Sequence, residues 1–226
     1  MNSSATIPML TIDGPSGSGK GTISLHVARE LGWRLLDSGV LYRAVGWVVN
    51  QEGIDPADHA AVTTCAQRTR IEFVATDDGS EVQVLVNDED LGAQLRTEVA
   101  GKFASAIAAI PGVREALLQL QLSLRQAPGL VADGRDMGTV VFPDAPFKVF
   151  LTASVAERAA RRYKQLREKG VEVKLEALQQ DLEARDARDT SRAVAPLKPA
   201  EGAVVVDTTG LSIDKVVAKV LAVVRG

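Results

Sequence analysis

Hydrophobic positions along the chain form two alternating kinds of segment. Short runs of consecutive apolar residues are typical of parallel strands that are buried on both faces. Longer segments with apolar residues three or four positions apart are typical of amphipathic helices. The expected strands are Met9–Asp13, Arg34–Asp37, Leu130–Asp133, Lys148–Leu151 and Ala203–Asp207. The expected helices are Lys20–Leu31, Leu41–Gln51, Ala57–Thr69, Val113–Gln126, Ser154–Lys169, Leu175–Asp189 and Ile213–Val224.

Strands that alternate with helices predict an α/β fold around a parallel sheet with right-handed crossovers. One stretch differs, because residues 70–75 and 81–87 alternate with period two around the turn-forming sequence TDDGS. This pattern predicts an antiparallel hairpin. We expect residues 1–226 to form a single unit, with a core of residues 9–69 and 101–226. The hairpin should begin an inserted subdomain over about residues 70–100. A basic segment over about residues 154–173 is a second excursion, and we expect it to form a lid over ligands at the sheet edge.

Composition narrows the class of protein. The 226 residues are enough for a core that needs no disulfide or metal. The net charge of −3 disfavours nucleic acid as the principal partner. The lone cysteine, Cys65, cannot form an internal disulfide, and we expect it to be an ordinary helix residue in a reducing compartment. No apolar run approaches the ~20 residues of a membrane span, and the first residues lack the features of a signal peptide. We therefore expect a cytoplasmic protein without a membrane partner.

A glycine-rich loop follows the first expected strand and opens the first expected helix. Its sequence, GPSGSGKGT, fits the phosphate-loop spacing G-x-x-x-x-G-K. Glycines let the backbone N–H groups face inward, and the helix N-terminus favours an anion. The loop departs from the usual form because Gly21 follows the lysine and the hydroxyl comes one position later, at Thr22. The predicted nucleoside triphosphate site comprises Gly14, Pro15, Ser16, Gly17, Ser18, Gly19, Lys20, Gly21 and Thr22.

Arginines and carboxylates follow the other expected strands. GTPases need a guanine-binding N-K-x-D sequence, and none is present. In the sequence VADGRDMGT, Asp133 ends a buried strand, where phosphate-loop enzymes keep the acid that orients Mg²⁺. Arg135 and Asp136 follow on the functional edge of the sheet. In LLDSGVLYR, Ser38 is placed either to cap a helix only or to bind a ligand, and Arg43 follows in the first turns.

Two helices carry further basic residues. Arg185, Asp189 and Arg192 share one helix face, either as surface ion pairs or as a bidentate grip on phosphate. Beside a phosphate loop, we favour the grip on phosphate. The basic segment contains Arg158, Arg161 and Arg162. These arginines would close over a transferring phosphoryl group.

Four motifs together resemble the bacterial cytidylate kinases of the nucleoside monophosphate kinase family. They are GPSGSGKGT, LDSGVLYR, DGRDMGTVVFPDA and RDARDTSRAVAPL, and the resemblance extends over nearly the whole chain. It implies a five-stranded parallel sheet flanked by helices, with an inserted monophosphate-binding subdomain and a short lid. It also implies transfer of the γ-phosphoryl group of ATP to CMP or dCMP, with Mg²⁺, by direct in-line attack.

The resemblance also implies roles for individual residues. Lys20, Arg158 and Arg162 would be catalytic, with Arg158 near the ATP base and Arg162 on the phosphoryl oxygens. Thr22 and Asp133 would lie nearest the magnesium ion, directly or through a water molecule. The substrate site would use Ser38, Arg43 and Arg135 for the CMP phosphate, Ser105, Arg114, Asp136 and Arg192 for cytosine, and Arg185 and Asp189 for the ribose.

Cytosine chemistry favours the same side chains. The base offers an amino donor beside two acceptors, so Ser and Asp suit the former and Arg suits the latter. Two alternatives stay open: a phosphate-loop kinase for another nucleoside monophosphate or small metabolite, and a nucleotide-dependent switch without catalysis. We expect a monomer that uses ATP and CMP or dCMP and has no stable nucleic-acid partner.

Overall fold

The computed structural model describes residues 7–75, 82–168 and 170–226. The chain divides into two compact units, one formed by residues 1–37 and 122–226 and the other by residues 38–121. The antiparallel hairpin lies in the second unit together with the helices that precede and follow it. An insertion near residues 70–100 and a lid near 154–173 stay predictions, and each unit is described by itself below.

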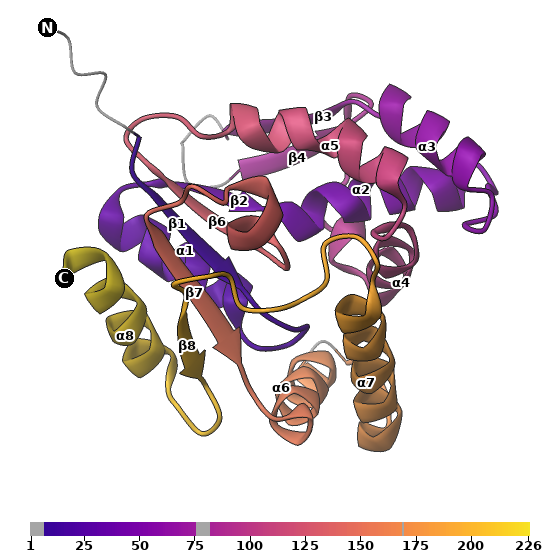
Figure 1. Ribbon diagram of the computed structural model, residues 1–226. Helices are drawn as coiled ribbons and strands as arrows, with labels where there is room; N and C mark the ends of the chain where they lie inside the picture. The colour runs from indigo at the N-terminus through magenta and orange to yellow at the C-terminus, as the bar shows by residue number, and fades with distance from the viewer. Residues whose placement is uncertain (1–6, 76–81, 169) are drawn as a thin grey trace, which may run out of the picture. The chain divides into compact units, whose positions relative to one another are not determined.

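The first unit is built on a five-stranded parallel sheet with the strand order β2-β6-β1-β7-β8 (Figure 1). Its strands are β1 (Met9–Asp13), β2 (Arg34–Asp37), β6 (Leu130–Gly134), β7 (Phe147–Thr152) and β8 (Val204–Asp207). Its helices are α1 (Lys20–Leu31), α6 (Val155–Glu168), α7 (Leu175–Ser191) and α8 (Ile213–Arg225). The predicted α/β fold with five parallel strands is confirmed, and these boundaries lie within two residues of those expected from the hydrophobic pattern.

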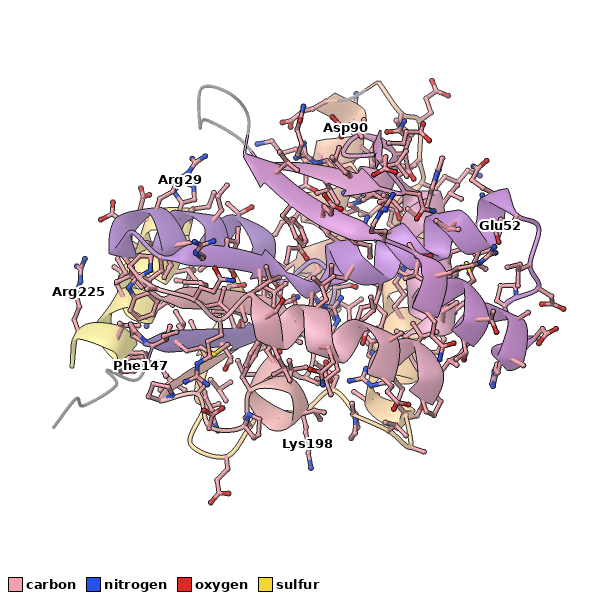
Figure 2. All side chains as sticks on the ribbon, turned by 90° about the horizontal axis from the view of Figure 1, so that it is seen from above. Arg29, Glu52, Asp90, Phe147, Lys198 and Arg225 are labelled. Carbon is pink, nitrogen blue, oxygen red and sulfur yellow. The ribbon has the colours of Figure 1, made fainter. Side chains whose placement is uncertain are left out.

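The core of the sheet is apolar on the side covered by α1 and α8. Leu10 and Ile12 of β1 are fully buried and belong to the same cluster as Val27 of α1 and Val220 of α8. The opposite faces of these helices are polar, and Figure 2 shows the Arg29 and Arg225 side chains pointing outward from their ends. A continuous apolar strand needs cover on both faces, which explains the absence of polar alternation in β1.

Helices α6 and α7 lie side by side and form a smaller cluster of their own (Figure 1). Ala159 and Leu166 of α6 pack with Leu178 and Leu182 of α7, all of them buried. The rest of both helices is strongly polar, so the pair presents charged faces outside this small seam. Several of those charges belong to the candidate site.

The second unit combines a small antiparallel sheet with four helices. The sheet has the order β3-β4-β5, and the pairing of Ile71 with Val86 confirms the predicted hairpin. Residues 76–81, on which the predicted turn falls, lie outside the described residues. The elements are α2 (Ser38–Gln51), α3 (His59–Arg68), β3 (Ile71–Ala75), β4 (Val82–Val86), β5 (Glu89–Asp90), a 3₁₀ turn (Gln94–Arg96), α4 (Glu98–Ile107) and α5 (Pro111–Ser123).

Helix α4 was not expected from the sequence. Its N-cap is Thr97, whose hydroxyl accepts a 3.3 Å hydrogen bond from the Ala100 N–H. The helix packs closely on α2 at Gly46, where an added Cβ would lie 2.9 Å from the Ala104 nitrogen. Two helices can approach this closely only over a residue without a side chain, so the glycine determines the fit.

A π-helical turn, Met137–Val141, follows β6 in the first unit and was also not expected. Such turns are rare and often lie at functional sites. Among the described residues, no single helix is long and apolar enough to cross a membrane, and α4 with α5 reaches that length only as a pair bent by 108°. Cys65 is a buried free cysteine in α3, as expected.

Candidate active site

Three neighbouring strands of the first unit have an aspartate at, or one residue before, their carboxyl end. Asp37 of β2 lies opposite Asp133 of β6 in the sheet register, and Asp13 of β1 lies opposite Gly134, one residue further along. The carboxyl ends of parallel strands are where open α/β sheets bind ligands. The sheet therefore brings three acidic side chains to its functional edge.

The phosphate loop leaves this edge between β1 and α1. Gly14 has a φ of 152°, and an added Cβ would lie 2.0 Å from the carbonyl oxygen of Leu151 on β7. No other residue fits there, so the loop turns tightly over the sheet. Gly19 has a left-handed conformation just before α1 begins at Lys20, which leaves the first N–H groups of the helix directed at the loop.

Lys20 is buried, and its Nζ donates a 2.8 Å hydrogen bond to the Pro15 carbonyl across the loop. Burial lowers the pKa of Lys20, with a further contribution from Arg135. Burial also raises the pKa of Asp133, against the opposing charge of Lys20. The ammonium and the carboxylate therefore stabilise each other's charge in a place that excludes water, which suits a site that receives phosphate groups.

Asp13 holds the turn that follows β6. Its Oδ1 accepts a 2.8 Å hydrogen bond from the Met137 N–H, and its Oδ2 accepts one of the same length from the Gly138 N–H. Burial raises the pKa of Asp13 to about 6, although these two hydrogen bonds oppose the shift. Asp136, the residue before the π-helical turn, is itself buried. The Asp13 carboxylate thus fixes the backbone next to Asp136.

Arg135, Asp189 and Arg192 form a continuous ionic group. Arg135 Nε donates to Asp189 Oδ2 at 2.9 Å, and Arg192 Nη2 pairs with Asp189 Oδ1. Both oxygens of Asp189 are therefore bound by guanidinium groups. Because Asp189 is only 6% exposed, these charge-assisted hydrogen bonds lie in a poorly hydrated place. Arg135 also reaches the phosphate loop, where its Nη2 donates to the Ser16 hydroxyl at 2.7 Å. The carboxylate thus orients two arginines.

Helix α6 contributes a second arginine bound to the loop. Arg158 is 3% exposed and donates from Nη1 to the Ser16 carbonyl at 2.9 Å. The same guanidinium pairs with both oxygens of Asp186 on α7, at 3.2 and 2.5 Å. Arg161 donates to the Thr208 carbonyl, at 2.7 Å, in the segment after β8. Helix α6 is therefore joined both to the phosphate loop and to α7.

The remaining predicted residues of the first unit differ in their exposure. Arg162 of α6 donates to the Gln165 side chain at 3.2 Å. Arg185 is half-buried on α7, and Thr22 is exposed in the first turn of α1. Ser18 is buried, and its hydroxyl has no hydrogen-bond partner in the described part of the chain.

Four predicted substrate residues lie in the second unit. Ser38 is buried and is the first residue of α2, one position inside the helix it was expected to cap. Arg43 of α2 donates to the Leu95 carbonyl at 2.9 Å, and Arg114 of α5 donates to the Ala108 carbonyl at 3.3 Å. The buried Ser105 hydroxyl of α4 has no partner among the described residues.

Comparison with known proteins agrees with the site. The model of the cytidylate kinase family matches residues 10–226. This chain belongs to the cytidylate kinase family. The cytidylate kinase of Pseudomonas entomophila strain L48 is 54% identical over 96% of this chain and 95% of that protein. The cytidylate kinase of Pseudomonas putida strain W619 is 54% identical over 97% of this chain and 96% of that protein.

A solved structure shares the fold at a greater distance. An uncharacterised protein from Eubacterium ventriosum ATCC 27560 superposes with a TM-score of 0.52 at 9% identity, covering 97% of this chain and 99% of that one. At this identity the likeness concerns the fold alone. The kinase family assignment therefore rests on the sequence match and on the loop geometry.

Sequence reasoning missed several residues that lie in the candidate site of this cytidylate kinase family member. Asp13 ends the strand before the phosphate loop, and Asp37 precedes Ser38, so position at a strand end could have identified both. Asp186 lies three residues before Asp189 in the repeated sequence ARDARD, which places both on one helix face. Nothing in the sequence indicated that the Ser16 hydroxyl would meet Arg135.

Proposed function

We propose that this chain transfers the γ-phosphoryl group of ATP to CMP or dCMP, giving ADP and CDP or dCDP. The observation that carries the proposal is the phosphate loop with its buried Lys20, because Ser16 of the same loop accepts a hydrogen bond from Arg135, which follows the neighbouring strand β6. A loop that only bound a nucleotide would not need a second phosphate-binding arginine beside it. Transfer requires two phosphates held in line, with their charge neutralised.

The donor end of the site is the loop itself. Its backbone N–H groups and Lys20 would bind the β- and γ-phosphates, where buried positive charge stabilises the developing negative charge. Arg158 binds the Ser16 carbonyl, which supports a role in shaping the loop around ATP. Arg162, which follows Arg161 on α6, would neutralise the remaining negative charge on the transferring phosphoryl group.

Magnesium fits the residues at the start of α1. Asp133 lies close to the loop, since an added Cβ at Gly21 would be 3.6 Å from its Oδ2, and the Thr22 hydroxyl is on the next residue. Mg²⁺ prefers oxygen ligands and is commonly held by one or two carboxylates plus substrate phosphates. Asp133 and Thr22 would therefore hold the ion, which supplies neutralisation of phosphate charge when bound.

The acceptor end would combine several arginines. We assign Ser38, Arg43 and Arg135 to the CMP phosphate, and Arg185 with Asp189 to the ribose. The base would be bound by Ser105, Arg114, Asp136 and Arg192. The unpartnered hydroxyl of Ser105 supports its part in this set, because a buried hydroxyl without a partner is costly unless a ligand satisfies it.

The assembly and location that we propose are simple. We propose that the protein acts as a monomer. The net charge of −3 supports the absence of a stable nucleic-acid partner. The free cysteine supports a reducing compartment, and we propose the cytoplasm. We propose no membrane partner.

The experiment that tests the function follows both products. The protein is incubated with MgATP and a large molar excess of CMP, and nucleotides are separated by anion-exchange chromatography. Equal amounts of ADP and CDP over many turnovers support the proposal. ADP without CDP would indicate an ATPase or a nucleotide switch, and no turnover would exclude both kinds of enzyme. The same assay without CMP measures background hydrolysis.

A further inference from the structure

Ser16 joins three parts of the first unit through its two oxygens. Its hydroxyl accepts a 2.7 Å hydrogen bond from Arg135 Nη2, and its carbonyl accepts a 2.9 Å hydrogen bond from Arg158 Nη1. Arg135 lies in the loop after β6, and Arg158 lies on α6. One residue of the phosphate loop is therefore in contact with both the acceptor side and the lid helix.

The two arginines are anchored on the same helix. Asp189 of α7 accepts from Arg135 Nε at 2.9 Å, and Asp186 of α7 accepts from Arg158 at 3.2 and 2.5 Å. The two aspartates are three residues apart, so they share one face of α7. Because Asp189 and Arg158 are almost fully buried, these charge-assisted hydrogen bonds are little weakened by water. Arg135 and Arg158 are therefore each held on one side by Ser16 and on the other by an aspartate of α7.

The contacts of Arg135 leave part of its guanidinium for a ligand. Within the described part of the chain, Nε donates to Asp189, Nη1 to the Gly134 carbonyl at 3.3 Å and Nη2 to Ser16. A guanidinium has five N–H donors, so one N–H on each terminal nitrogen is left to face a phosphate. The hydroxyl of Ser16 determines the rotation of this fork. Without it, only Asp189 and a long backbone contact would orient the group.

A triphosphate bound in the phosphate loop can affect the position of the Ser16 hydroxyl. Ser16 lies between Gly14 and Gly17, which both have positive φ, so glycines with a wide choice of backbone conformations flank it on both sides. A triphosphate that fills the loop restricts the position of Ser16. We propose that Ser16 is a positioning residue that couples the ATP site to the CMP phosphate site through the Arg135 guanidinium. This inference rests on the proposed role of Arg135 in binding the CMP phosphate.

The coupling has a measurable form. If bound ATP fixes Ser16 and Ser16 fixes Arg135, a non-hydrolysable MgATP analogue must tighten CMP binding, and CMP must tighten binding of the analogue by the same factor. Typical couplings between two sites are about 5–150-fold. A ligand changes an equilibrium only through its different affinity for the two states, which here are the loop with Ser16 restrained and unrestrained.

Isothermal titration calorimetry measures the Kd of CMP with and without saturating MgAMPPNP. The wild type should give a ratio of at least about 5 between the two constants. Ser16→Ala should bring the ratio near one, and Ser16→Thr, which keeps the hydroxyl, should restore it. The matched control is Ser24→Ala, which removes a buried hydroxyl of α1 that has no partner in the described chain. It should keep the wild-type ratio.

Each result decides the proposal. If Ser16 only stabilises the fold, Ser16→Ala weakens both constants by the same factor, and an unchanged ratio overturns the coupling. A wild-type ratio of one overturns it as well. Arg135→Ala separates this failure from a failure of the proposed site. Unchanged CMP binding in Arg135→Ala would refute the phosphate role of Arg135. If Arg135→Ala weakens CMP binding but Ser16→Ala keeps the wild-type ratio of the two CMP constants, only the coupling is refuted.

Discussion

The Asp13 carboxylate caps the π-helical turn by accepting a 2.8 Å hydrogen bond from the Gly138 N–H, 125 residues along the chain. A second bond from the Met137 N–H, also 2.8 Å, fixes the other oxygen. The strand that leads into the phosphate loop is thereby tied to the loop that carries Asp133, Arg135 and Asp136. Since Asp13 is 2% exposed, its ionisation should influence the stability of the protein.

We predict a specific pH dependence for Asp13→Asn. The folded pKa of about 6 lies above the ordinary value of 3.8, so folding favours the protonated acid. Relative to Asp13→Asn, the wild type should therefore lose stability as the pH rises from about 4 to about 6, and the difference should be level above that. The change should be roughly 3 kcal/mol, at 1.36 kcal/mol per pKa unit. Urea unfolding of both proteins at several pH values measures it, and a difference that does not vary with pH would refute the raised pKa.

Lys20→Ala should reduce turnover by more than ~100-fold while the fold persists, because one preorganised charge at a developing anion contributes about that much. Lys198→Ala is the matched control, because this lysine is exposed in the same unit (Figure 2). Steady-state kinetics with circular dichroism on both variants checks the prediction. Turnover of Lys20→Ala within threefold of wild type would remove the lysine from the catalytic set.

Gly14→Ala should cost on the order of 3 kcal/mol of unfolding free energy, because the new methyl group would meet the Leu151 carbonyl at 2.0 Å. Gly210→Ala separates backbone strain from this contact. Gly210 also has a positive φ, 67°, but nothing lies within 4 Å of an added Cβ. We expect it to cost only about 1–2 kcal/mol. Equal losses in thermal or urea unfolding would mean that the close approach of Leu151 contributes nothing.

Much of the first unit is predictable from the sequence because its strands are buried on both faces and its helices are amphipathic. Helix α4 is amphipathic but was missed, and its close packing depends on Gly46 of another helix, which no local pattern reveals. The π-helical turn was missed because it depends on Asp13, far away along the chain. Motifs single out Lys20, Asp133 and Arg135 as candidate site residues, but no local pattern reveals that Arg135 and Arg158 meet at Ser16.

Base choice should depend on Asp136 and not on Arg43. Uracil carries an oxygen where cytosine carries its amino group, so an Asp136 acceptor would face another acceptor. Asp136→Ala should therefore impair CMP more than UMP and lower the ratio of their kcat/KM values. Arg43→Ala, whose assigned target is the shared phosphate, should weaken both substrates by similar factors. If the CMP/UMP ratio of Asp136→Ala equals that of wild type, Asp136 does not bind the base.

The most direct test of the central claim is kcat/KM for CMP, dCMP, UMP and AMP in one coupled assay with saturating MgATP. Two mismatched polar groups in a buried base pocket cost about 1–3 kcal/mol each. CMP should therefore exceed UMP by about 10²–10⁴, at 1.4 kcal/mol per factor of ten. AMP lacks the pyrimidine pattern and should be poorer than CMP as well. Equal or greater values for UMP or AMP would contradict the assignment of cytidine monophosphate as the acceptor.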